Sequence, residues 1–122
     1  MKYIPLNVKS EYDLMNSLIK IDDYISYALD NNINALGLTD QNMFGAYEFI
    51  SKCNQNNIKS IVGIELEIDN NKIYLFARNY DGYISLCKIV SKKNIDESID
   101  INYIKNLDNI ILVCSYNEYE KY

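Results

Sequence analysis

The chain has 122 residues, of which 48% are apolar, and its 12 basic and 17 acidic side chains give a net charge of −5. This length and apolar content are sufficient for one packed core, so we expect a single domain over residues 1–122. A negative surface repels a phosphate backbone, and direct binding of nucleic acid by this chain is therefore disfavoured.

The cysteines and the apolar segments indicate the cellular compartment of the protein. Cys53, Cys87 and Cys114 are far apart in the sequence and lack the paired spacings of zinc or redox motifs. They are predicted to be buried thiols in a reducing compartment. The first ten residues lack the apolar core of a signal peptide, and no run of about 18 apolar residues is available to span a membrane. We therefore expect a soluble cytoplasmic protein.

The first half of the chain alternates predicted strands and helices. In order, these are a strand at Tyr3–Val8, a capping-box-like helix start at Ser10 and Asp13, a helix at Ile21–Asp30, a buried strand at Ala35–Thr39 and a helix at Phe44–Asn56. Helical spacing predicts two buried stripes, one on each longer helix. They are Ile21, Ile25, Ala28 and Leu29 on the first, and Phe44, Tyr47, Ile50 and Cys53 on the second.

The second half begins with a predicted hairpin. Strands at Lys59–Ile68 and Lys72–Ala77 flank the polar turn Asp69–Asn71. A helix at Tyr83–Lys93 and a last strand at Ile110–Cys114 follow. The alternation of strands and helices predicts an α/β fold with a mainly parallel sheet, one hairpin and about three helices.

Four stretches of this sequence occur together in one known family. They are Leu6-Asn7-Val8-Lys9-Ser10-Glu11-Tyr12, Leu38-Thr39-Asp40-Gln41-Asn42-Met43-Phe44-Gly45-Ala46-Tyr47-Glu48-Phe49, Ile58-Lys59-Ser60-Ile61-Val62-Gly63-Ile64-Glu65, and Ala77-Arg78-Asn79-Tyr80-Asp81-Gly82-Tyr83 with Leu86-Cys87-Lys88-Ile89-Val90-Ser91. In order and spacing they resemble the PHP domain that opens the alpha subunit of bacterial DNA polymerase III. The resemblance covers about residues 3–92 and implies the first portion of a PHP (β/α) barrel.

The resemblance also indicates where a metal site would lie. Metal-binding members carry a His-x-His pair after the first strand, an Asp-His pair after the second, and a later Glu. The matching positions here are Asn7, Lys9, Asp40, Gln41 and Glu65. An amide coordinates transition metals poorly and an ammonium group repels them, so no metal site is expected.

The two remaining carboxylates have competing interpretations. Asp40 follows a strand and precedes a helix, where a turn or cap role is favoured over metal ligation. Glu65 is hypothesised to form an internal ion pair with Lys9 in place of the metal, with Asn7 and Gln41 as hydrogen-bond partners. No catalytic or cofactor-binding residue is expected in this chain. The terminal tyrosines Tyr116, Tyr119 and Tyr122 are expected to lie on an exposed tail.

The resemblance implies that the chain is a piece of a replicative DNA-directed DNA polymerase. Polymerisation and its Mg²⁺ ions are then expected elsewhere in the longer protein, while this piece stabilises the polymerase or docks a proofreading exonuclease subunit. The expected partners are the remainder of the alpha subunit and that exonuclease, with no membrane or direct nucleic-acid contact. The alternatives are a stand-alone metal-dependent phosphoesterase of the PHP superfamily, which the absence of histidine disfavours, and an unrelated α/β interaction module.

Overall fold

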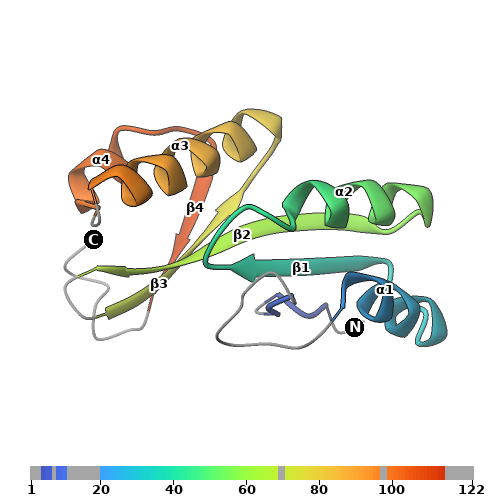
Figure 1. Cartoon of the computed structure of the whole chain (residues 1–122). Coiled ribbons are helices and arrows are strands. Elements are labelled where there is room, and N and C mark those ends of the chain that lie inside the picture. The colour runs from blue at the N-terminus through green and yellow to red at the C-terminus, as the bar shows by residue number, and fades with distance from the viewer. Residues whose placement is uncertain (1–3, 7, 11–19, 69–70, 97–98, 115–122) are drawn as a thin grey trace. The chain divides into compact units, whose positions relative to one another are not determined.

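The structure is a computed structural model that describes residues 4–6, 8–10, 20–68, 71–96 and 99–114. Figure 1 shows the helices and strands formed by these residues. Their bounds are α1 Ile21–Asp30, β1 Ala35–Asp40, α2 Ala46–Gln55, β2 Lys59–Ile68, β3 Asn71–Ala77, α3 Tyr80–Asp96, α4 Ile101–Lys105 and β4 Ile110–Val113. The predicted mixed α/β class is confirmed. No helix in the described ranges has the length and apolar character needed to cross a membrane.

The four strands form one sheet in the order β1-β2-β3-β4, and the prediction of a mainly parallel sheet is wrong. Only two residues join β2 to β3, a connection that permits antiparallel pairing alone. The strands β3 and β4 are also antiparallel, with Ala77 opposite Ile110. The helices α3 and α4 lie between β3 and β4 in the sequence. After them the chain returns to the end of β3, where Arg78 N donates to Asn109 O at 2.9 Å. A parallel crossover would instead return the chain to the far end of β3.

The chain divides into two compact units, residues 1–63 and 64–122. In the first, all residues of β1 are buried. The helices α1 and α2 contact each other through the stacked rings of Tyr24 and Phe49, whose centroids are 6.0 Å apart. Lys52 on α2 forms ion pairs with Glu48 at 2.8 Å and with Asp22 on α1. An aromatic contact and a surface ion pair therefore connect the two helices.

Three residues predicted to be buried are exposed. Phe44 is 73% and Tyr47 76% exposed, and Leu29 is 49% exposed. The helix α2 begins at Ala46, later than predicted, and Phe44 precedes it in a turn where Asn42 Oδ1 accepts a hydrogen bond from Phe44 N at 2.9 Å. The buried face of α2 consists of Ala46, Phe49 and Cys53. On α1 the buried stripe is shifted around the helix relative to the prediction and includes Tyr24 in place of Leu29.

The segment before α1 was predicted to contain a strand and a capping box. The described residues 4–6 and 8–10 are not assigned to a strand. They nevertheless lie along β1, because Gly37 N donates to Pro5 O at 2.7 Å and Thr39 N donates to Val8 O at 2.9 Å. The capping box includes Asp13, which lies outside the described residues.

In the second unit, Asn79 connects the start of α3 to the start of β4. Its Oδ1 caps the helix by accepting from Gly82 N at 3.0 Å, and its Nδ2 donates to Asn109 Oδ1 at 3.2 Å. A Cβ atom at Gly82 would lie 2.1 Å from Asn109 O, so only glycine permits this approach. The cap explains why α3 begins before the predicted Tyr83.

The helix α3 also extends beyond its predicted end, and α4 was not predicted. Asp100 caps α4 by accepting from Asn102 N at 3.0 Å.

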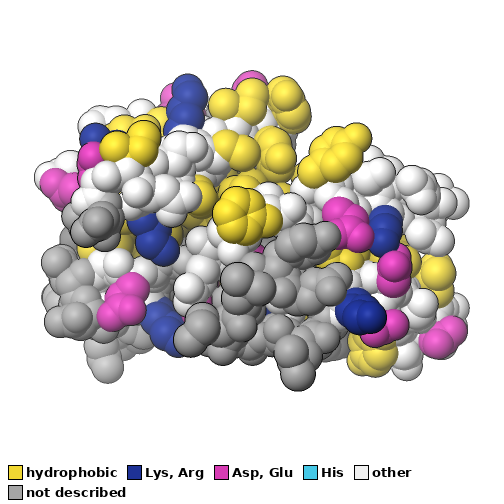
Figure 2. All heavy atoms as spheres, viewed as in Figure 1, with side chains coloured by type: hydrophobic (Ala, Val, Ile, Leu, Met, Phe, Trp, Pro, Cys, Tyr) yellow, Lys and Arg dark blue, Asp and Glu magenta, His cyan; other side chains and the backbone are white. Residues whose placement is uncertain are grey.

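Large apolar side chains remain exposed on α3, among them Tyr80 and Ile95. Figure 2 shows hydrophobic side chains at the surface over this helix, near the top of the view.

The cysteines are less uniformly buried than predicted. Cys53 is buried within α2, and burial raises the pKa of its thiol to about 12. Cys87 and Cys114 are half-buried, so the prediction that they are buried is wrong. A thiol with a raised pKa is a poor nucleophile, which favours a packing role for Cys53.

Gly37→Ala is expected to destabilise the chain. An added Cβ would lie 2.6 Å from Leu6 Cα and 2.8 Å from Leu6 O, and both are backbone atoms that cannot rotate away. Overpacking of this kind costs about 1–3 kcal/mol, which urea denaturation followed by circular dichroism can measure. The control is Ser26→Ala at an exposed position of α1, expected to change the free energy of unfolding by less than about 0.5 kcal/mol. Equal stability of the two variants would contradict the close approach.

Candidate functional site

The candidate site is centred on Asp40, the last residue of β1. The side chain is buried, with 1% of its surface exposed. Its Oδ1 accepts a hydrogen bond from Ser10 N at 2.6 Å, and its Oδ2 accepts one from Ser10 Oγ at 2.5 Å. A buried carboxylate requires such donors, because loss of hydration is otherwise uncompensated. Asp40 therefore ties the segment before α1 to the end of β1, whereas its predicted turn or cap role stays a prediction.

Lys9 lies beside this pair. Its Nζ donates to Thr39 O at 2.9 Å, and Thr39 is fully buried. The ammonium group is therefore held at the carbonyl of the residue that precedes Asp40. Serine at position 10 was not among the predicted site residues. Its position directly after Lys9, within a stretch that resembles the family, could have identified it as a site residue.

The other predicted positions of this end of β1 are less informative. Gln41 is exposed and follows the strand directly. Asn7 lies outside the described residues. Their predicted role as hydrogen-bond partners of an internal ion pair stays a prediction.

Glu65 lies on β2 in the second compact unit and is 3% exposed. Its Oε1 accepts a hydrogen bond from Tyr74 OH at 3.2 Å, and Lys72 Nζ lies 3.8 Å from the same oxygen. Both partners are on β3. The hydroxyl and the ammonium group compensate a carboxylate that has lost most of its water.

Sequence reasoning missed Tyr74 and Lys72 as neighbours of Glu65. The hairpin was predicted with the three-residue turn Asp69–Asn71, whereas only two residues separate β2 from β3. A two-residue connection puts Tyr74 opposite Glu65 on the neighbouring strand. The pairing of Glu65 with Lys9 stays a prediction. In the described part of the chain, no group of three or more Cys, Asp or Glu side chains is arranged to hold a metal ion.

Ser10→Ala is expected to lower the free energy of unfolding by about 1–3 kcal/mol, because it removes the hydroxyl donor from a buried carboxylate. Thermal or urea denaturation provides the measurement. Ser26→Ala, which removes a hydroxyl from an exposed position of α1, is the matched control. If both variants unfolded at the same urea concentration, the contact between Ser10 and Asp40 would not contribute to stability.

The sequence was compared with known families and proteins. The family model of the PHP domain matches residues 5–122. DNA polymerase III subunit alpha of Ureaplasma parvum is 41% identical over 113 residues, which are 92% of this chain and 12% of that protein. The same subunit of Mycoplasma genitalium is 31% identical over 93% of this chain and 13% of its own length. The same subunit of Staphylococcus aureus is 33% identical over 88% of this chain and 11% of its own length.

The chain therefore spans only about an eighth of the length of these relatives. Its similarity to them is continuous across both compact units, since it includes about nine tenths of the chain. The family model likewise covers the residues of β1 and β2 that carry Asp40 and Glu65. This chain belongs to the PHP domain family.

Proposed function

We propose that this chain is the amino-terminal part of a DNA polymerase III alpha subunit, a replicative DNA-directed DNA polymerase of the cytoplasm. The similarity to such subunits over about nine tenths of the chain carries the proposal. Because the chain corresponds to 11–13% of those proteins, nucleotidyl transfer and its Mg²⁺ ions belong to other parts of the polymerase. The net charge of −5 is consistent with a piece that does not hold the DNA itself.

The proposed role of this piece is structural, without catalysis. Metal-dependent hydrolysis requires an ion that lowers the pKa of its bound water. The chain has no histidine, and the Lys9 ammonium group is bonded to the carbonyl next to Asp40. A dication bound at Asp40 would be repelled by that positive charge.

The hydrogen bonds of Asp40 support the same conclusion. Each carboxylate oxygen already accepts a donor from Ser10, so fewer lone pairs remain for a metal ion. The Glu65 carboxylate is likewise bonded to Tyr74 and close to Lys72. Protein groups thus provide the compensation that bound ions would otherwise provide.

The proposed partners follow from this role. A PHP domain without catalysis stabilises the remainder of the alpha subunit or docks a separate proofreading exonuclease subunit. Apolar side chains that remain exposed, such as Phe44 on the first unit and Tyr80 on the second, are available for contacts of this kind.

The genomic reading frame tests the identity of the parent protein. Sequencing downstream of the codon for Tyr122 is expected to reveal a continuous frame encoding the rest of a polymerase. Full-length protein expressed from that frame should extend a DNA primer in the presence of Mg²⁺. A stop codon at this position, followed by an unrelated gene, would contradict the proposal.

Metal titration tests the structural role. Isothermal calorimetry with Mn²⁺ or Zn²⁺ is expected to show no binding tighter than about 10⁻⁴ M, because a single carboxylate that already has internal partners binds a dication weakly. Asp40→Asn should leave the titration unchanged. Tight stoichiometric binding that Asp40→Asn abolishes, together with hydrolysis of a phosphomonoester, would favour a metal-dependent phosphoesterase instead.

A further inference from the structure

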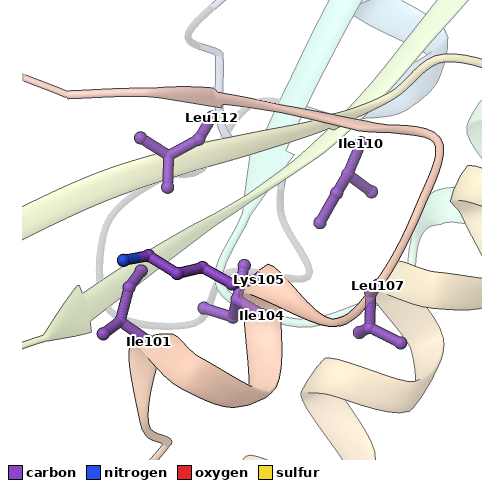
Figure 3. A pocket seen from close by; sticks show the side chains of 6 residues that line it. All are labelled: Ile101, Ile104, Lys105, Leu107, Ile110 and Leu112. Atoms are coloured by element: carbon purple, nitrogen blue, oxygen red, sulfur yellow. The ribbon is translucent and has the colours of Figure 1, made fainter.

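We draw no further inference here: the strongest candidate, the apolar pocket between α4 and β4 in the second compact unit (Figure 3), carries nothing because the structure does not show what covers it.

Discussion

The two hydrogen bonds from Ser10 to Asp40 are the contacts on which the candidate site depends. They join residues 30 positions apart in the sequence and fix the segment before α1 at the end of β1. Hydrogen bonds to charged groups contribute about 1.5–3 kcal/mol each, a large share of the net stability of a small domain. The backbone bonds from Gly37 and Thr39 to the same segment extend this connection along the strand.

This constraint also supports the structural role proposed for the end of β1. A carboxylate positioned by buried donors is well suited to structure, whereas a metal ligand must present its lone pairs to an ion. Lys9 adds a positive charge that is held by Thr39 O in the same region. Glu65, in the other unit, has a tyrosine hydroxyl and a lysine as neighbours. The contacts of Asp40 with Ser10, and of Glu65 with Tyr74 and Lys72, are the observations that support the proposed loss of hydrolytic function.

The sequence predicted the local elements better than their arrangement. The helix at Ile21–Asp30 and the strand at Lys59–Ile68 have the predicted bounds, because their periodicity and turn residues are local signals. Asn32 adopts a φ of 55° just after α1, the left-handed conformation that commonly ends a helix. Strand direction was wrong because alternating strands and helices do not reveal that α4 returns the chain to the end of β3 that it left.

The site positions were predictable only through the family resemblance. Spacing alone does not show that Ser10 approaches Asp40, since that contact depends on how residues far apart in the sequence pack. Phe44 and Tyr47 illustrate a second limitation. Their helical spacing indicates an apolar face, but it does not show whether other residues of this chain cover that face, and both side chains are exposed. Such a face is buried by a partner as readily as by the chain's own core.

Anomalous diffraction from crystals of the chain grown with Mn²⁺ tests the central claim most directly. The account predicts no anomalous peak within bonding distance of Asp40 or Glu65, with the bonds from Ser10 to Asp40 intact. Strong peaks coordinated by both carboxylates, with Ser10 displaced, would contradict it.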